Sequence, residues 1–98
     1  MDREGILKTL SDHRHVLQKY GIKSIRLFGS FARGDAAPGS DVDLLVEFAP
    51  DAPVGLFEFI RLKNELSDLL ACEVDLATPN ALHKAMKDEI LREAILAA

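Results

Sequence analysis

Residues 41–48 read Asp-Val-Asp-Leu-Leu-Val-Glu-Phe, and this stretch predicts one β-strand with two different faces. In an extended chain the apolar side chains at every second position from Val42 to Phe48 point to one side, as a core face requires. The carboxylates of Asp41 and Asp43 then leave the opposite face together. Aspartate is disfavoured in strands, so this pair either lines a wet surface or binds a ligand. Their mutual repulsion favours a hard divalent cation, Mg²⁺ or Mn²⁺.

A second short strand carries another acid in similar surroundings. Residues 72–77, Cys-Glu-Val-Asp-Leu-Ala, place Asp75 between apolar neighbours. If this strand lies beside 41–48, Asp75 joins the same face, and three carboxylates on adjacent strands can hold two cations roughly 3.5–4 Å apart. That arrangement serves in-line phosphoryl or nucleotidyl displacement. Glu73 has the same facing and is the rival third ligand, and an ordinary exposed strand position is the alternative for Asp75.

A glycine–serine turn follows the strand expected over residues 23–28. Gly29-Ser30 breaks the alternating pattern, and residues 30–33 can form one helical turn that Gly34 closes. Glycine lets the backbone approach a phosphate, and the free N–H groups of the turn with the Ser30 hydroxyl can donate to its oxygens. Arg33 lies one turn further and could reach the same anion. An ordinary turn is the alternative, and neither a Walker loop nor G-x-G-x-x-G occurs.

Helices are expected in the rest of the chain. Hydrophobic spacing and end signals predict them over residues 4–20, 54–70 and 79–97. The order is then α-β-(turn)-β-α-β-α, which predicts an α/β fold: a small sheet with flanking helices. The strands joined through residues 54–70 can form a parallel unit, whereas the pairing of the first strand is left open.

Apolar side chains of the expected helix over residues 54–70, and the single tyrosine, are expected to pack inside. Within residues 54–70 the side chains predicted to face inward are Phe57, Ile60, Leu66 and Leu69. The single tyrosine, Tyr20, ends the first helix and is interpreted as a packing residue, with a self-modification site as the alternative.

Length and composition bound the class of protein. The 98 residues, with 48% hydrophobic and 29% charged side chains, predict one domain spanning 1–98. No apolar stretch is long enough for a membrane span, no signal peptide is visible, and one cysteine excludes an internal disulfide. A cytoplasmic location is expected.

The charge is unevenly distributed along the chain. The formal net charge is -4, with seven basic and four acidic residues in 1–40 and five basic and twelve acidic residues in 41–98. This argues against generic DNA coating, so no direct nucleic-acid binding is expected. A local basic patch beside an acidic cluster would instead suit an anionic substrate bridged by cations.

Taken together, these motifs resemble a known enzyme superfamily. Gly29-Ser30, the ten-residue gap to Asp41-Val-Asp43, and Asp75 in Val-Asp-Leu on a later strand resemble the DNA polymerase β-like nucleotidyltransferases. The closest likeness is to their smallest members, the MNT-type (minimal nucleotidyltransferase) domains, over roughly residues 22–77. The resemblance implies the nucleotidyltransferase fold, a small mixed sheet with flanking helices.

The resemblance also implies a role for each matching residue. Gly29 and Ser30 would bind the triphosphate of ATP, with Arg33 as a secondary phosphate contact. Two Mg²⁺ ions would be bound by Asp41 and Asp43. Asp75 would complete the site of the ion nearest the acceptor, and it is a candidate base for the attacking hydroxyl. That hydroxyl would attack the α-phosphorus and release pyrophosphate.

MNT-type domains are similar to the antitoxin half of bacterial HEPN/MNT pairs, in which AMP can pass from ATP to a tyrosine of the HEPN ribonuclease. The chain lacks an Arg-x(4–6)-His ribonuclease signature, as expected for the MNT half. The resemblance therefore favours transfer of AMP to a hydroxyl of a HEPN-type partner protein. Transfer to a small molecule is an alternative, although the second domain of larger relatives is missing. A non-catalytic antitoxin that acts by binding is the other alternative.

Overall fold

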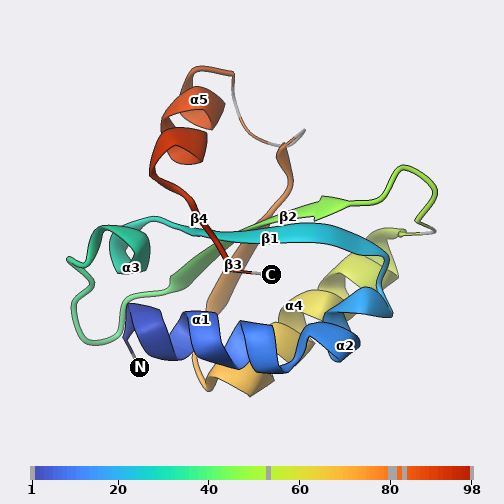
Figure 1. Ribbon diagram of the computed structural model, residues 1–98, viewed down its shortest axis with the longest axis horizontal. Helices are drawn as coiled ribbons and strands as arrows, with labels where there is room; N and C mark the ends of the chain where they lie inside the picture. Colours follow the sequence, from blue (N-terminus) through green and yellow to red (C-terminus); the bar gives the residue numbers. More distant parts are fainter. Residues whose placement is uncertain (1, 53, 80–81, 83, 98) are drawn as a thin grey trace.

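The computed structural model describes residues 2–52, 54–79, 82 and 84–97, which fold as a four-stranded sheet with helices on both faces (Figure 1). The helices are α1 (Arg3–Asp12), α2 (Arg14–Gln18), α3 (Ser30–Arg33), α4 (Leu56–Leu70) and α5 (Lys84–Glu93). The strands are β1 (Ile22–Phe28), β2 (Val42–Phe48), β3 (Val74–Ala77) and β4 (Ile95–Leu96). Within these residues no helix is both long and apolar enough to cross a membrane.

The sheet is mixed, and its order is β3-β2-β1-β4. Strand β2 pairs with β3 in parallel, and α4 makes the crossover between them, as the sequence predicted. Strand β1, whose pairing the sequence left open, runs antiparallel to β2. The predicted α/β fold with a small mixed sheet and flanking helices is confirmed.

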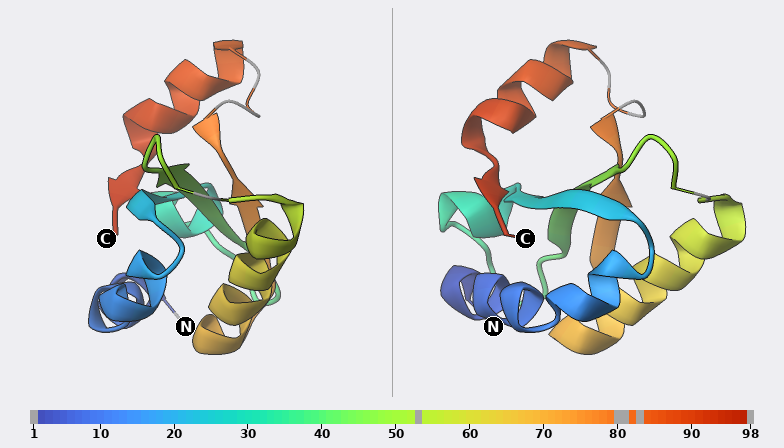
Figure 2. Two further views of the ribbon diagram at one scale, coloured as in Figure 1. Left: turned by 90° about the vertical axis from the view of Figure 1, so that its right-hand side faces the viewer. Right: turned by 45° about the vertical axis from the view of Figure 1, so that its right-hand side comes forward.

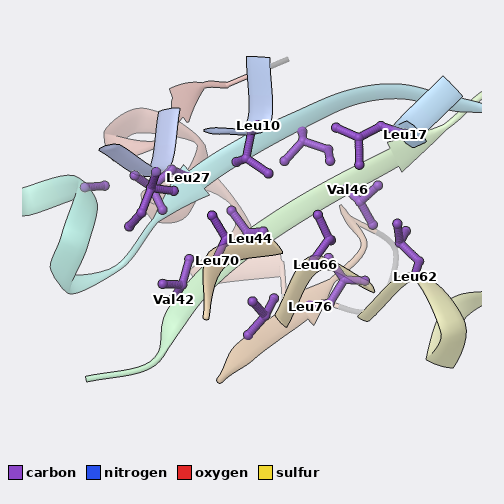
Figure 3. Packing of buried hydrophobic residues seen from close by; sticks show 14 residues of the cluster. Leu10, Leu17, Leu27, Val42, Leu44, Val46, Leu62, Leu66, Leu70 and Leu76 are labelled. Atoms are coloured by element: carbon purple, nitrogen blue, oxygen red, sulfur yellow. The ribbon is translucent and has the colours of Figure 1, made fainter. Parts of the chain in front are cut away.

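The two faces of the sheet have different coverings. Helices α1, α2 and α4 lie against one face, and α5 lies on the other (Figures 1 and 2). On β2, Val42, Leu44 and Val46 are fully buried and pack among side chains of α1 and α4, including Leu10 and Leu66 (Figure 3). Because side chains alternate along a strand, Asp43 projects from the opposite face, on the side of α5.

The buried face of α4 differs from the one predicted. Leu62, Leu66 and Leu70 are buried and Phe59 packs partly against the core, which is a continuous stripe at spacings of three and four residues. Leu66 was predicted correctly, but Phe57 and Ile60 were not, because their side chains are 81% and 46% exposed. They lie off this stripe, since two residues along a helix turn the side chain by about 200°.

The C-terminal helix is shorter than predicted. Residues 80, 81 and 83 of the predicted range 79–97 lie outside the described residues, and α5 ends at Glu93. Residues Ile95–Leu96 form β4, which pairs with Arg26 and Leu27 of β1. Helical propensity is overridden here because the free edge of β1 offers backbone partners: the Ala97 N–H donates to the Ile25 carbonyl at 2.8 Å.

The predicted N-terminal helix over residues 4–20 is divided in two. His13 interrupts it with non-helical backbone angles, φ -108° and ψ 25°. Its Nδ1 donates to the Thr9 carbonyl at 2.8 Å, which ends α1 before α2 begins. Leu10 and Leu17 both face the core.

Candidate active site

Asp43 and Asp75 lie side by side on the face of the sheet that α5 overlooks. The parallel register pairs Asp43 with Asp75, flanked by the pairs Val42–Val74 and Leu44–Leu76. Paired residues on neighbouring strands send their side chains to the same face. The structure therefore brings these two predicted site residues together.

Asp41 directly precedes β2, at the same end of the sheet as Asp43. It is exposed, and with Glu73 it lines a cavity of about 570 Å³ bounded by the loop that contains Ser40. The Val42 N–H donates to the Glu73 carbonyl at 3.0 Å, which holds the starts of the two strands together. Glu73 is thus a neighbour of Asp41, whereas Asp75 is the neighbour of Asp43.

The charges of Asp41 and Asp75 both act on the carboxyl group of Asp43. Burial raises the pKa of the Asp43 carboxyl, and the charges of Asp75 and Asp41 raise it further. The charge of Arg33 lowers the same pKa. The Asp43 carboxylate is therefore repelled by Asp41 and Asp75 and attracted by Arg33. A bound cation would relieve the repulsion.

Gly29 approaches Asp43 so closely that only glycine fits. Its backbone has φ 76° and ψ -154°, a conformation that side chains disfavour. A Cβ at this position would collide with the Asp43 carboxylate. Since Phe28 is paired with Asp43 across β1 and β2, the turn after β1 is set directly beside the acidic cluster.

The predicted helical turn is present as α3, beginning at Ser30. Its first intrahelical bonds run from Arg33 N to the Gly29 carbonyl at 3.1 Å and from Gly34 N to the Ser30 carbonyl at 2.9 Å. The N–H groups of residues 30–32 fall outside this pattern, as at any helix start, and can donate to another group. Gly34 closes the turn in the left-handed conformation, as the sequence predicted.

Side-chain contacts from α1, α5 and the loop after α3 hold α3 in place. Arg3 of α1 donates from Nη1 to the Ala32 carbonyl at 3.1 Å. Arg33 donates from Nε to Asp35 Oδ2 and from Nη1 to Glu93 Oε1 of α5, both at 3.2 Å. Sequence reasoning missed these partners. Asp35 follows Arg33 closely enough to have been suspected, but nothing in the sequence connects Arg33 with residue 93.

The residues at this edge fit a hard divalent cation. All the candidate ligands are carboxylates, and the repulsion at Asp43 favours a cation. Among the described residues, however, no three His, Cys, Asp or Glu side chains lie close enough to make a metal-binding group unaided. Mg²⁺ commonly takes only one or two carboxylates and completes its shell with water and substrate phosphates. The two-ion site on Asp41, Asp43 and Asp75 stays a prediction.

Comparison with known families places this geometry in context. The nucleotidyltransferase domain family matches residues 10–97. The chain belongs to this family. The match covers the sheet, α3 and α4, so the predicted nucleotidyltransferase fold is confirmed and the chain is a nucleotidyltransferase. The paired Asp43 and Asp75 and the Gly29-Ser30 turn lie within the matched residues.

Relatives of similar length are named protein adenylyltransferases. A protein adenylyltransferase of Thermococcus cleftensis, MntA, is 38% identical over 93 residues, which are 94% of this chain and 92% of the relative. A Methanocaldococcus jannaschii chain, provisionally named a protein adenylyltransferase, is 44% identical over 80 residues, covering 82% of this chain and 84% of the relative.

Solved structures agree with the fold. A structure provisionally named a minimal nucleotidyltransferase superposes with a TM-score of 0.82 at 36% identity, covering 97% of this chain and 95% of the other. The fold is also shared, at 17% identity and a TM-score of 0.67, with a chain in the structure of a tri-AMPylated Shewanella oneidensis HEPN toxin in complex with MNT antitoxin. That match covers 95% of this chain and 71% of the other.

Proposed function

We propose that this nucleotidyltransferase moves AMP from ATP, with Mg²⁺, to a hydroxyl of a HEPN-type partner protein and thereby acts as its antitoxin. The observation that carries the proposal is the pairing of Asp43 with Asp75 directly beside the Gly29-Ser30 turn. Carboxylates for cations and backbone donors for phosphate then meet at one edge of the sheet. These are the two requirements of nucleotidyl transfer from a triphosphate.

The choice of a protein acceptor rests on the relatives. MntA of Thermococcus cleftensis is named a protein adenylyltransferase, and the Shewanella oneidensis MNT antitoxin of shared fold is bound to an AMPylated HEPN toxin. Another toxin–antitoxin structure of shared fold, 21% identical with a TM-score of 0.70, contains AMP-PNP and supports a nucleoside triphosphate as substrate. Its match covers 100% of this chain and 73% of the other.

The proposed chemistry assigns each residue a task. The acceptor oxygen bonds to the α-phosphorus of ATP while the bond from that phosphorus to the bridging oxygen breaks and pyrophosphate leaves. Gly29 lets the backbone approach the phosphates, Ser30 holds them through its free N–H group at the start of α3, and Arg33 contacts them from the end of that turn. The proton of the acceptor hydroxyl passes to a carboxylate, for which Asp75 is the candidate because it is exposed.

The cations would be held by the same acidic edge. Asp43 and Asp41 would contact both ions, and Asp75 would contact the one nearest the acceptor. When bound, Mg²⁺ supplies positive charge against the phosphate oxygens and the carboxylates. The role of the chain is to keep Asp43 in place: burial of its neighbours Val42 and Leu44 fixes the strand from which it projects.

Transfer of label tests this function directly. The chain is incubated with a HEPN-type partner, Mg²⁺ and α-labelled ATP, beside the variants Asp41→Asn and Asp43→Asn, which nearly keep shape but remove charge. Label is expected on the partner with the wild-type chain only, and it should vanish when a chelator removes Mg²⁺. Asp51→Asn, an exposed acid after the other end of β2, is the matched control and should label normally.

Other outcomes select the alternatives. Neutralisation of the partner that persists in both variants, with no label transferred, would replace the enzyme with a binding antitoxin. Label on small hydroxyl compounds in the absence of any partner protein would favour a small-molecule acceptor.

A further inference from the structure

The side chain of Arg33 is held by two carboxylates, one from the adjoining loop and one that lies 60 residues further along the chain. Asp35 Oδ2 accepts from Nε, and Glu93 Oε1 accepts from Nη1, both at 3.2 Å. Asp35 belongs to the loop after α3, whereas Glu93 is the last residue of α5, on the far side of the sheet from α1. A guanidinium has five N–H donors, so these two contacts leave three for another anion.

We propose that Glu93 is a positioning residue for Arg33, holding its guanidinium beside the acidic cluster so that the remaining donors face the triphosphate. The inference rests on the proposed function, because it takes Arg33 as a phosphate contact. It adds that the C-terminal segment, for which the sequence predicted only a helix, contributes to nucleotide binding.

A need for such a support follows from how short α3 is. Arg33 is the last residue of a four-residue helix, and its side chain is about half exposed. A free arginine side chain has many rotamers, and it loses that freedom when it is held in one geometry. Holding it in place before the ligand arrives removes part of that cost from binding. An exposed ion pair of this kind contributes little to folding stability.

The position of Glu93 is itself fixed by the fold. Two residues after it, Ile95 pairs with Leu27 of β1, and Ala97 N donates to the Ile25 carbonyl. Strand β1 leads directly into Gly29 and α3. Through β4, the end of α5 is therefore attached to the same strand that presents the phosphate-binding turn, so Glu93 and Arg33 are held to one framework.

The charge of Arg33 also reaches the acidic cluster. It lowers the pKa of Asp43, the opposite of what Asp75 and Asp41 do. The geometry agrees with this, because Arg33 ends the helix α3, which begins directly after Gly29, and Gly29 lies against the Asp43 carboxylate.

Binding of AMP-PNP with Mg²⁺ to the full chain, measured by isothermal titration calorimetry, tests the inference. Glu93→Gln keeps the shape and is expected to weaken binding by about two- to fivefold, the range of an exposed ion pair. In the transfer assay the same variant should raise KM for ATP and leave kcat unchanged. Glu89→Gln is the matched control: it removes the same charge one turn earlier on α5, from an exposed position, and should bind as the wild type does.

A double-mutant cycle isolates the path through Arg33. If Glu93 acts by holding Arg33, Glu93→Gln should have no further effect in an Arg33→Gln background. Suppose that Arg33→Gln alone weakens binding, so that the nucleotide role of Arg33 stands. Unchanged or tighter binding by Glu93→Gln, or an equal loss from Glu93→Gln in both backgrounds, would then overturn the inference. If Arg33→Gln binds like the wild type, or the wild type does not bind, the nucleotide role of Arg33 fails and the inference falls with it.

Discussion

Asp43 of β2 and Asp75 of β3 are register partners across two parallel strands, and their carboxylates leave the same face of the sheet. The relationship is produced by α4, which returns the chain so that β3 runs alongside β2 in the same direction. Had the register slipped by one residue, Asp75 would face the apolar layer and Val74 the solvent. Burial of Val74 and Leu76 against the core prevents that slip, so hydrophobic packing places the acid.

This pairing predicts which acid is the third site residue. Asp75→Asn should lower the rate of nucleotidyl transfer by about 10²- to 10³-fold, the scale for removing one preorganised electrostatic contact. Glu73→Gln should lower it by much less, because Glu73 lies beside Asp41 at the cavity and is not the register partner of Asp43. Initial rates with saturating ATP compare the two, and a larger loss in Glu73→Gln would exchange their roles.

The repulsion at Asp43 predicts a variant that is inactive but more stable. Because burial and neighbouring charge raise the pKa of the folded carboxyl, its stability contribution is complete below the unfolded pKa and is lost as the pH rises through the folded one. At neutral pH the ionised group therefore costs stability. Asp43→Asn should lose transfer activity and melt at a higher temperature, each kcal/mol being about 4–8 °C for a domain of this size.

Thermal melts without metal or nucleotide, at pH 7 and near pH 3, test whether the ionised Asp43 carboxylate lowers the stability of the wild type. The advantage of Asp43→Asn should shrink at the lower pH, where the wild-type carboxyl is also neutral. Asp51→Asn, in an exposed turn, controls for loss of any acidic charge. An Asp43→Asn chain that is less stable than wild type at pH 7 would contradict the repulsion.

Gly29 should tolerate no side chain. Gly29→Ala places a methyl group against the Asp43 carboxylate and forces a side chain into a positive-φ conformation, which costs about 1–3 kcal/mol. Both stability and transfer activity should fall, because the group displaced is itself a site residue. Gly39→Ala is the control, since it has φ 85° but nothing within 4 Å of its Cβ. If the two variants lose activity equally, the contact with Asp43 is not what matters at Gly29.

Tyr20 offers a pH test of the packing between α2 and α4. Its hydroxyl donates to Glu65 Oε2 at 2.6 Å, and burial together with that contact raises its pKa from 10.0 to about 12. It is the only tyrosine and no tryptophan is present, so ultraviolet absorbance of the phenolate reports this residue alone. The phenolate should form well above pH 10 in the folded chain and near pH 10 in denaturant.

The stability that Tyr20 contributes should be present below pH 10 and lost as the pH rises toward 12. Tyr20→Phe should cost about 1 kcal/mol at neutral pH and show no such loss. Glu65→Gln should move the phenolate midpoint downward. A midpoint near 10 in the folded wild type would mean that the contact with Glu65 does not persist in solution.

The sequence predicted β2 correctly because a strand with one buried face carries an apolar side chain at every second residue. Val42, Leu44 and Val46 are buried as that pattern requires, and the Gly29-Ser30 turn with its closing Gly34 forms where the breaks in pattern indicated. The same reasoning failed on α4 and at the chain end. A broad apolar surface on a helix does not say which stripe a sheet will cover, so Phe57 was misplaced.

Local pattern thus determined the strands β1, β2 and β3, the acids on one face and the Gly29-Ser30 turn, since each depends on backbone geometry over a few residues. The tertiary structure alone decided which acid stands beside Asp43, that the chain end pairs with β1, and that Glu93 contacts Arg33. These depend on strand register, on a free sheet edge and on contacts across 60 residues of sequence. Such features have no local signal because they arise only when the hydrophobic layers pack.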